Sequence, residues 1–431
     1  MNSPRPTVID LFAGAGGFSL GFEQAGFDVV AAVEIDPIHA AVHKFNFPEC
    51  TILPKSVSDI SGKDLINASN GRTVDVLVGG APCQGFSLIG QRALDDPRNS
   101  LVRDYIRLVI EIRPYYFVFE NVKGLTVGKH RLFLEEIIEE LTSAGYSVCK
   151  PWKVLNAKYF RVPQSRERLF LMGSLNAASI PGYPEQDIIP VSCYEALGDL
   201  PNAEIFDELL ESDKIRYQPN PAHSAYAQEM RCETRESWKY GYQRRWDDSM
   251  LTSSLRTNHT LISRNRFAQT EQGRVEPISR FFKLSRDGIS NTLRAGTDSA
   301  RGAFTSPRPI HYEHPRCVTV REMARLHGFP DWFRFHETKW HGARQIGNAV
   351  PPPLAYAIGM QIQSRIEGKL TKPRKIIDLG DESLLCMDMS QASNYWGVEN
   401  PIGKRNRKSG ARKRKQFEIE AARTNGTNKN G

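Results

Sequence analysis

At 431 residues and 48.6 kDa, the chain is long enough for about two or three domains with a substantial buried core. No N-terminal segment has the features of a signal peptide, and no run approaches the ~18 apolar residues of a membrane span, so we expect a cytoplasmic protein. The seven cysteines are scattered and odd in number, which argues against a disulfide framework and against a zinc site.

The formal net charge of +8 is distributed unevenly. Residues 401–431 carry ten Lys or Arg and two Glu, so this tail accounts for the whole excess. The stretch 181–230 is acidic, whereas 231–345 has 21 basic residues, 18 of them Arg, against 12 acidic ones. Because a guanidinium can bind phosphate or guanine through two parallel hydrogen bonds, 231–345 is predicted to be a nucleic-acid face. A solvated basic surface without a partner is the alternative.

The first 175 residues alternate β-rich runs with amphipathic stretches, which predicts an α/β domain with a mostly parallel sheet. We expect strands at 7–12, 29–34, 74–78 and 116–120, a short segment ending at Asp59, an antiparallel pair at 148–155 and 169–172, and helices at 18–25, from Pro37, at 101–112 and at 132–144.

From Pro181 the periodicity is lost, which predicts a second, loop-rich domain. Helical spacing returns at 320–327 and 354–366, and these helices are expected to complete the first domain. Beyond Leu370 the pattern fades, and 403–415 has the composition of a disordered segment.

Ligands of a doubly wound sheet bind beyond the carboxyl ends of its strands. The residues expected there are Gly14, Gly16 and Gly17 after the first strand, then Glu34, Asp59, Cys83 and Glu120 after the next four. Ser19 stands where the dinucleotide fingerprint has its third glycine, so the loop indicates a nucleoside site only in general terms. Glu34 or Asp59, taken alone, is more typical of an ordinary helix cap.

Five motifs, in order and at the right spacing, resemble those of the DNA (cytosine-5) methyltransferases of bacterial restriction-modification type. They are Asp10–Phe18, Pro82-Cys83-Gln84, Glu120-Asn121-Val122, Gln164–Arg168 and Gly347–Val350, and Val320–Pro330 resembles the motif that precedes the final helix of that family. The resemblance implies a Rossmann-like doubly wound sheet, the fold of S-adenosylmethionine-dependent methyltransferases, with a smaller, loop-rich target-recognition domain.

The residues also suit the reaction that the resemblance implies. Carbon 5 of cytosine is a poor nucleophile, and a thiolate added to carbon 6 converts it into an enamine carbon, a case of covalent catalysis. Cys83 is the expected nucleophile, and Glu120 the general acid at ring nitrogen 3. Arg166 and Arg168 would place positive charge at the carbonyl of the base, with the more direct role for Arg166. A surface ion-pair ladder is the alternative for these arginines.

The implied methyl donor is S-adenosylmethionine, and no metal is expected. By resemblance, Phe12 lies against the adenine, Glu34 holds the ribose, and Asp59 and Ile60 contact the adenine edge. The glycines at 14, 16 and 17 admit the methionine portion, and Asn348 helps to close the pocket.

The implied substrate is double-stranded DNA whose target cytosine is swung out of the helix. In the segment 84–100, Ile89 and Gln91 are candidates to fill the gap, and Ser87 and Arg98 to contact phosphates. Arg256 and Arg264 are the DNA contacts selected in the second domain, where Tyr240, Trp246, Asn258 and Arg266 are further candidates and core packing is the alternative for the aromatics.

The expected organisation is a catalytic and cofactor-binding domain at 1–182, a target-recognition domain at 183–315, a return segment at 316–367 and a basic, partly disordered tail at 368–431. We expect a monomer that acts on nucleoid DNA, with a cognate restriction endonuclease as a further partner. A tRNA cytosine-5 methyltransferase and a non-catalytic DNA-binding regulator are the alternatives. A dehydrogenase is disfavoured by Ser19 and by the lack of a hydride-transfer constellation.

Overall fold

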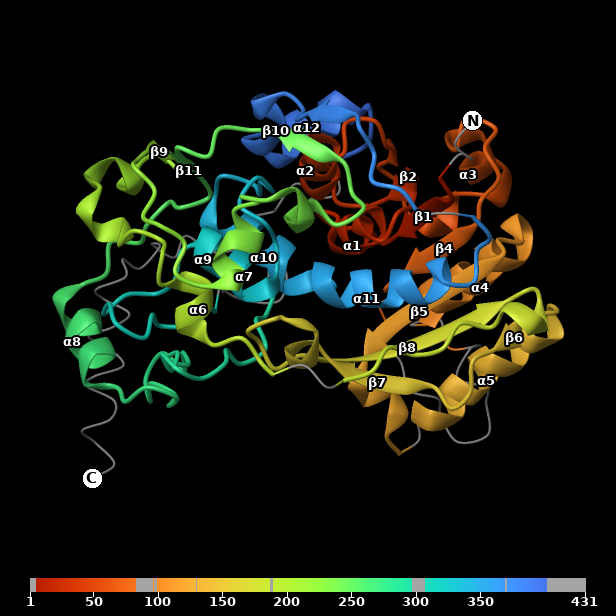
Figure 1. The fold of residues 1–431 in the computed structure, drawn as a ribbon, viewed down its shortest axis with the longest axis horizontal. Coiled ribbons are helices and arrows are strands. Elements are labelled where there is room, and N and C mark those ends of the chain that lie inside the picture. The colour runs from red at the N-terminus through yellow and green to blue at the C-terminus, as the bar shows by residue number, and fades with distance from the viewer. Residues whose placement is uncertain are drawn as a thin grey trace, which may run out of the picture.

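The computed structural model describes residues 5–82, 96, 99–128, 130–186, 189–296, 307–368 and 370–400. Two lobes lie side by side along its longest axis (Figure 1). The sheet lobe holds the strands of residues 7–174 with their helices, and the second lobe consists of short helices and loops from the middle of the chain. Within the described ranges, no helix is both long and apolar enough to cross a membrane.

The sheet has eight strands, ordered β3-β2-β1-β4-β5-β8-β6, with β7 paired to β8. Its first five strands are parallel, and β8 runs antiparallel to β5, β6 and β7. The bounds are β1 Thr7–Leu11, β2 Asp28–Val33, β3 Thr51–Leu53, β4 Val76–Gly79, β5 Tyr116–Val122, β6 Ser147–Val148, β7 Lys153–Asn156 and β8 Glu167–Ser174. Winding reverses between β1 and β4, so the topological switch point lies there.

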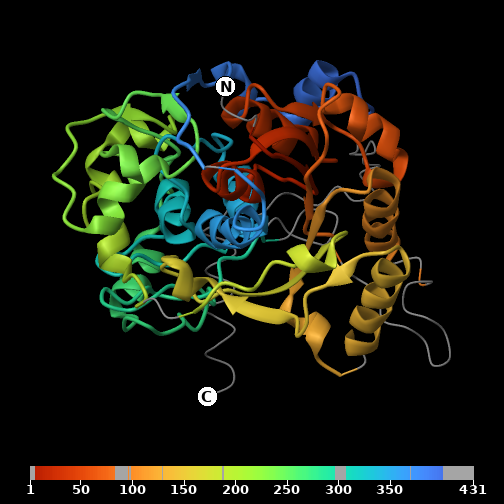
Figure 2. The ribbon, with the colours of Figure 1, turned by 45° about the vertical axis from the view of Figure 1, so that its right-hand side comes forward.

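Helices cover both faces of this sheet. Phe18 and Phe22 of α1 pack with Leu354 and Ile358 of α11 against one face, whereas α3, α4 and α5 cover the other. Figure 2 shows α4 above α5 beside the strands. The bounds are α1 Gly17–Gln24, α2 Pro37–Asn46, α3 Gly62–Ala68, α4 Ser100–Ile112, α5 His130–Ser143 and α11 Pro352–Gln363. Every residue of β1 and β4 is buried, as expected for strands that are covered on both faces, and the predicted α/β class is confirmed.

The second lobe is mostly loop, with short elements. They are α6 Cys193–Leu197, α7 Ala225–Met230, α8 Leu261–Gln269, β9 Ile215–Arg216, β11 Met250–Leu251 and the 3-10 turns η7 Ala203–Ile205, η8 Asp207–Leu210 and η9 Arg235–Trp238. Two helices of the return segment, α9 Val320–His327 and α10 Lys339–Asn348, belong to its core. That core is continuous with residues of α2 and of the glycine loop, so the lobes share one hydrophobic cluster.

Several arginines of the basic stretch are interior residues. Arg325 is fully buried between Asp199 and Asp331, and Arg316 donates two hydrogen bonds of 2.8 Å to the buried Glu322. Among the described residues of 231–345, the buried arginines are Arg231, Arg244, Arg308, Arg316, Arg321, Arg325 and Arg334. The basic excess of this stretch is therefore partly internal, and the prediction that it forms one nucleic-acid face is corrected to that extent.

Residues 376–396 are more ordered than their pattern indicates. Residues Ile376–Asp378 form β12, which pairs in parallel with β10 (Gln243–Arg245). The turn η11 (Glu382–Leu385) and the helix α12 (Met389–Trp396) then pack on α2, and Trp396 donates a hydrogen bond to the carbonyl of Pro37. Tertiary contacts with α2 order this segment, and the division into domains stays a proposal.

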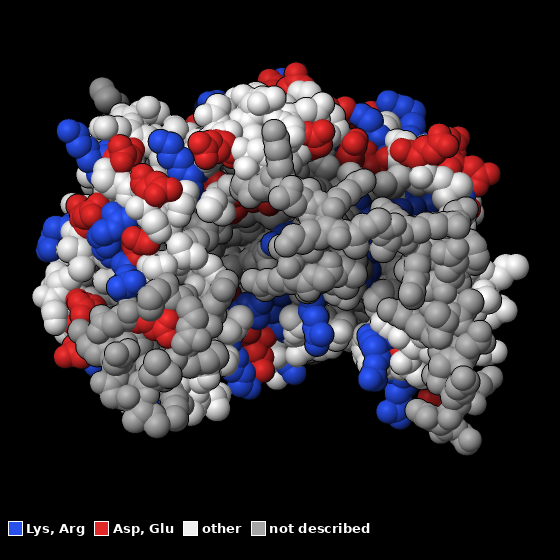
Figure 3. Space-filling view, turned by 180° about the vertical axis from the view of Figure 1, so that it is seen from behind, with Lys and Arg blue, Asp and Glu red and all other residues white. Residues whose placement is uncertain are grey.

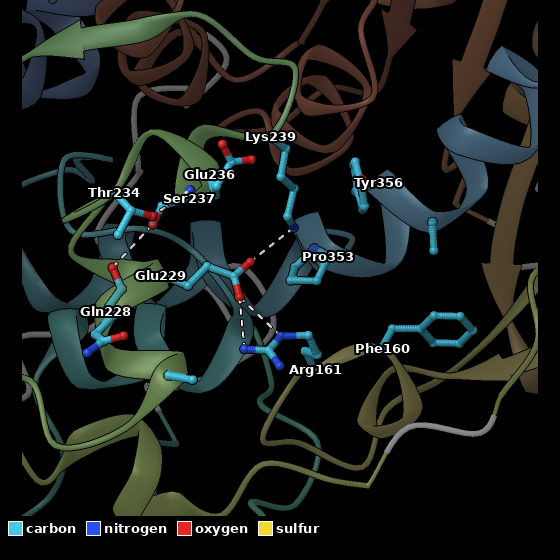
Figure 4. A pocket seen from close by; sticks show the side chains of 12 residues that line it. Phe160, Arg161, Gln228, Glu229, Thr234, Glu236, Ser237, Lys239, Pro353 and Tyr356 are labelled. Carbon is cyan, nitrogen blue, oxygen red and sulfur yellow. Dashed lines mark hydrogen bonds and ion pairs between the residues drawn. The ribbon is translucent and has the colours of Figure 1, made fainter. Parts of the chain in front are cut away.

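The segment 240–244 of the second lobe lies directly against α1. Tyr240 donates its amide hydrogen to the carbonyl of Gln24, and the buried Arg244 ion-pairs with Glu23 at 2.7 Å. Beside this segment, the carboxylate of Glu229 on α7 contacts both Lys239 and Arg161 (Figure 4). Arg161 follows the turn η5 (Ala157–Phe160). A cavity of about 420 Å³ opens here between the lobes.

Candidate active site

A cavity of about 510 Å³ lies at the carboxyl ends of β1, β2, β4 and β5. Of the predicted site residues, the structure brings together five that were predicted to bind the cofactor and the carboxylate predicted to be catalytic. They are Phe12, Gly14, Gly17, Glu34, Asn348 and Glu120. The cavity also reaches Pro82, the residue before Cys83. The switch point of the sheet is therefore a pocket large enough for a nucleoside ligand.

The glycine loop is shaped by close contacts as well as by conformation. Gly16 precedes α1 in the left-handed conformation, at φ 107°. A Cβ on Gly17 would lie 2.3 Å from the carbonyl oxygen of Val350, so only glycine lets the return segment approach α1 this closely. Gly16 itself is absent from the lining of the cavity, and its role is to turn the chain into the helix.

Asp10 and Ser19 fix the start of α1. The Asp10 carboxylate accepts hydrogen bonds from the amide and the hydroxyl of Ser19, at 3.1 and 2.7 Å. Ser19 thus anchors the start of α1 to Asp10, at the position where the dinucleotide fingerprint needs glycine. The other carboxylate oxygen, Oδ1, is buried and has no partner, and Asp10 lines the cavity. Burial raises the pKa of Asp10 to about 7.

Glu34 follows β2 and faces the glycine loop. Its Oε2 accepts a hydrogen bond of 2.7 Å from the amide of Gly14, and its Oε1 accepts one of 2.9 Å from the amide of Asp36. Burial raises the pKa of this carboxyl. Each oxygen retains a lone pair for a ligand in the cavity.

Two predicted cofactor residues lie apart from the others. Asp59 ends the turn η1 (Val57–Asp59) and is exposed, and Ile60 is buried beneath it. Neither lines the cavity, where Val57 of the same turn and its N-cap residue Ser56 lie instead.

Glu120, near the end of β5, is the carboxylate of the site. Its Oε1 lies 2.8 Å from Nε of Arg168, and its side chain is 11% exposed. Burial raises the pKa of Glu120, although the charges of Arg168 and Arg166 oppose the shift. A buried carboxyl with a raised pKa retains its proton to higher pH than an ordinary glutamate, as a general acid requires.

The two predicted arginines differ in what they contact. Arg166 is 1% exposed and donates hydrogen bonds to three backbone carbonyls, those of Leu293, Gly347 and Ala349. Arg168, and not Arg166, is ion-paired with Glu120. The expectation that Arg166 has the more direct role is therefore at odds with this geometry.

Asn121 is a residue of the site that the sequence did not single out. Its Nδ2 donates a hydrogen bond of 2.9 Å to the carbonyl of Ala81, and its Oδ1 accepts one of 2.8 Å from the amide of Val122. This buried amide therefore fixes the backbone two residues before Cys83. Its place beside Glu120, in a motif, was the available signal.

The predicted residues Cys83, Ser87, Ile89, Gln91 and Arg98 lie outside the described residues. In the second lobe, Arg256 is ion-paired with Asp207, and Arg264 with Glu204. Among the described residues, no group of three or more His, Cys, Asp or Glu side chains could hold a metal ion.

Residues 6–364 match the family model of the C-5 cytosine-specific DNA methylases. The chain belongs to this family. It is a DNA cytosine-5 methyltransferase, and this identification disfavours both the tRNA enzyme and the non-catalytic regulator.

The methyltransferase is similar to named Type II enzymes over most of its length. It is 56% identical over 402 residues to the Type II methyltransferase M.XorII of Xanthomonas oryzae pv. oryzae, covering 92% of this chain and 94% of that one. It is 34% identical over 363 residues to M1.HphI of Haemophilus parahaemolyticus, covering 82% and 85%. A crystal structure described as a prophage-encoded DNA modification methyltransferase of E. coli superposes with a TM-score of 0.69 at 31% identity, covering 83% of this methyltransferase and 99% of that chain.

Proposed function

We propose that this methyltransferase is a sequence-specific enzyme of Type II restriction-modification kind, with Cys83 as nucleophile and Glu120 as general acid. One observation carries the assignment of roles: Glu120, which is buried and ion-paired with Arg168, lines the same cavity as the glycine loop and Pro82, directly before Cys83. A thiolate, a proton donor and a nucleoside pocket at one sheet edge are what methylation at carbon 5 requires.

The chemistry follows from these groups. The Cys83 thiolate forms a bond to carbon 6 of the flipped cytosine, and Glu120 gives its proton to ring nitrogen 3, which neutralises the charge that develops on the ring. Arg168 keeps Glu120 in place and presents a cation beside the base. Once carbon 5 has gained the methyl group, its proton passes to water, and the electrons of that C–H bond form the C5–C6 double bond as the C6–S bond breaks and the thiolate leaves. Ring nitrogen 3 then returns its proton to Glu120.

S-adenosylmethionine is the methyl donor of such an enzyme, and the cavity fits it. The unpartnered Oδ1 of Asp10 is an acceptor for an ammonium group, and the lone pairs of Glu34 suit ribose hydroxyls. No side chain would obstruct a ligand over Gly14, since a Cβ there would have no neighbour within 4 Å. Phe12, Gly17 and Asn348 complete the proposed pocket. For Asp59 and Ile60 the proposal rests on resemblance alone.

Double-stranded DNA would enter between the lobes on the face seen in Figure 3, where a hollow has Lys and Arg side chains along its lower rim. Ser87, Ile89, Gln91 and Arg98 remain proposed contacts on sequence grounds. If Arg256 and Arg264 contact DNA, phosphate or a base must displace Asp207 and Glu204. The same proposal includes recognition of the DNA target by the second lobe, a monomeric state, a cytoplasmic location and a cognate endonuclease.

Replacing the nucleophile tests this assignment. Cys83→Ser should abolish methyl transfer from labelled S-adenosylmethionine to duplex DNA while DNA binding is retained, and the wild type should form a covalent adduct at Cys83 on a duplex containing 5-fluorocytosine. Cys386→Ser, which replaces an exposed thiol, is the control and should retain activity. Full activity of Cys83→Ser, or labelling of tRNA in place of DNA, would contradict the proposal.

A further inference from the structure

Three distant segments of the chain meet in a buried polar junction beside the cofactor cavity. They are Gln164–Arg166 before β8, Ser290–Leu293 of the second lobe, and Gly347–Ala349 at the end of α10. His327, the last residue of α9, contacts two of these segments. In Figure 1, α9, α10 and the start of α11 lie together where the lobes meet.

Gln164 connects the junction to the second lobe. Its side chain is fully buried, and its Oε1 accepts a hydrogen bond of 3.0 Å from the amide of Leu293. The neighbouring backbone repeats the connection, because the amide of Ser165 donates to the carbonyl of Ser290 at 2.9 Å. Arg166 donates to the carbonyl of Leu293 at 3.0 Å. The amide and the carbonyl of Leu293 are therefore both hydrogen-bonded to side chains that precede β8.

His327 connects Gln164 to the segment Gly347–Val350 beside the cavity, which is called the cofactor segment below. Its Nδ1 lies 2.9 Å from Nε2 of Gln164, and its Nε2 lies 3.0 Å from the carbonyl oxygen of Ala349. Since an amide nitrogen can only donate, Nδ1 accepts and Nε2–H donates, which requires a neutral imidazole. Burial lowers the pKa of His327 well below its ordinary value, consistent with that state.

The cofactor segment is also held sterically from both sides. A Cβ on Gly347 would lie 2.4 Å from the amide nitrogen of Ala295, so the second lobe packs directly on its backbone. On the other side, Val350 approaches Gly17 of the glycine loop. Between these contacts, Asn348, Ala349 and Val350 line the cofactor cavity. A displacement of 290–295 cannot leave the cavity wall unchanged, because packed interiors do not deform continuously.

We propose that His327 and Gln164 are positioning residues that couple the place of the second lobe to the cofactor pocket, so that DNA and S-adenosylmethionine bind with positive cooperativity. The proposal rests on the proposed occupant of the cavity. DNA bound between the lobes would fix 290–295, the junction would then fix Gly347–Ala349, and the donor would meet a preformed wall. By thermodynamic linkage, bound S-adenosylmethionine must raise the affinity for DNA by the same factor as bound DNA raises the affinity for S-adenosylmethionine.

The test measures binding of S-adenosylhomocysteine, which carries no transferable methyl group, with and without a duplex containing the site found by bisulfite sequencing. Wild type should bind it at least five-fold more tightly in the presence of that duplex. His327→Phe, which keeps an aromatic ring beside Phe329 but removes both hydrogen bonds, should abolish most of this difference. Its KM for S-adenosylmethionine should rise several-fold while kcat at saturating donor changes little.

Two further variants separate coupling from loss of packing. His327→Gln offers an acceptor and a donor at its end and should recover part of the cooperativity. His311→Phe removes another buried histidine, one that accepts hydrogen bonds from the amides of Glu313 and His314 remote from the junction, and should retain the wild-type ratio even where its Tm falls equally.

Equal ratios for His327→Phe and wild type, or an equal loss in His311→Phe, would overturn the coupling. Failure of the wild type to bind S-adenosylhomocysteine at all would instead overturn the proposed function.

Discussion

At the scale of single residues, the site depends on which side chains are buried next to which charges. Glu120 has only Arg168 as its ion-pair partner among the described residues, and burial outweighs that positive charge to give the carboxyl a raised pKa. Arg166, two positions away on the chain, is occupied by backbone carbonyls. Side chains two positions apart on an extended chain point to the same side, so the sequence pattern does not distinguish the two arginines. Only their surroundings distinguish their roles.

The raised pKa of Glu120 leads to a prediction for the pH dependence of turnover. The protonated carboxyl is the active acid, so kcat should fall as pH rises through this raised pKa, above the range of an ordinary carboxyl. Glu120→Gln cannot transfer a proton, and its kcat should be about 10²–10⁴-fold lower, with that limb missing from the profile. Single-turnover methylation across pH measures both effects.

The neighbouring Glu167→Gln is the matched control for this prediction. Glu167 is half exposed and paired with Lys123, so its replacement should leave the pH profile of the wild type. Near-normal kcat in Glu120→Gln, with the same pH limb, would contradict the assignment of Glu120 as the acid.

At the scale of elements, the lobes are held together by ion pairs on the face of Figure 1. Glu229 of α7 contacts Arg161 and Lys239, and Lys239 also lies over the ring of Tyr356 on α11, 4.2 Å from its centroid (Figure 4). Lys239 has φ 51° and ψ −117°, a backbone conformation that residues with a Cβ rarely adopt. Its two side-chain contacts hold it there, which indicates that this cluster fixes α7 against α11.

Glu229→Gln should therefore destabilise the fold by about 1–2 kcal/mol, because it leaves two partly buried cations without their partner. Burial alone would raise the pKa of Glu229, but Lys239 and Arg161 lower it below its ordinary value. The stabilisation is thus present above the ordinary carboxyl pKa and is lost as pH falls through the lowered value. The difference in Tm from the wild type should shrink on acidification.

Glu135→Gln removes an exposed i,i+4 pair with Arg131 and provides the comparison. It should change the free energy of unfolding by less than about 0.5 kcal/mol. Chemical unfolding of the two variants at neutral pH measures the contrast, and equal effects would show that the Glu229 cluster does not hold the lobes together.

At the scale of the whole molecule, the lobes share a hydrophobic cluster, and both contribute to the walls around the cofactor cavity. The described chain ends at residue 400, just after α12, which packs on α2. The basic tail 401–431 lies outside the described residues, and its ten Lys or Arg can add phosphate contacts that do not depend on sequence.

Deleting 401–431 should therefore make DNA affinity less sensitive to salt. For every phosphate that the tail neutralises, the deletion should reduce the slope of log K against log salt concentration by about 0.9. Binding of a duplex over a series of salt concentrations measures the slope, and a full-length variant with the Lys and Arg of the tail replaced by Gln should behave like the deletion. An unchanged slope in both would mean that the tail does not bind DNA.

The sequence by itself determined the parallel sheet, the boundaries of α9 and the family, because these depend on local signals. Apolar runs, the helical spacing of 320–327 and the ordered motifs are all read along the chain. Cys83 and Glu120 were selected in the same way, since their chemistry is tied to position after a strand.

Only the tertiary structure decided which arginines face the interior, which one meets Glu120, and how Asn121 and His327 contribute. These outcomes depend on contacts between residues far apart in sequence, such as Arg325 with Asp199 or Gln164 with Leu293. Charge counted along the chain predicts a surface, but burial with a carboxylate converts the same charge into a structural contact. The order in 376–396 has the same origin, because α12 is held by α2 and not by its own pattern.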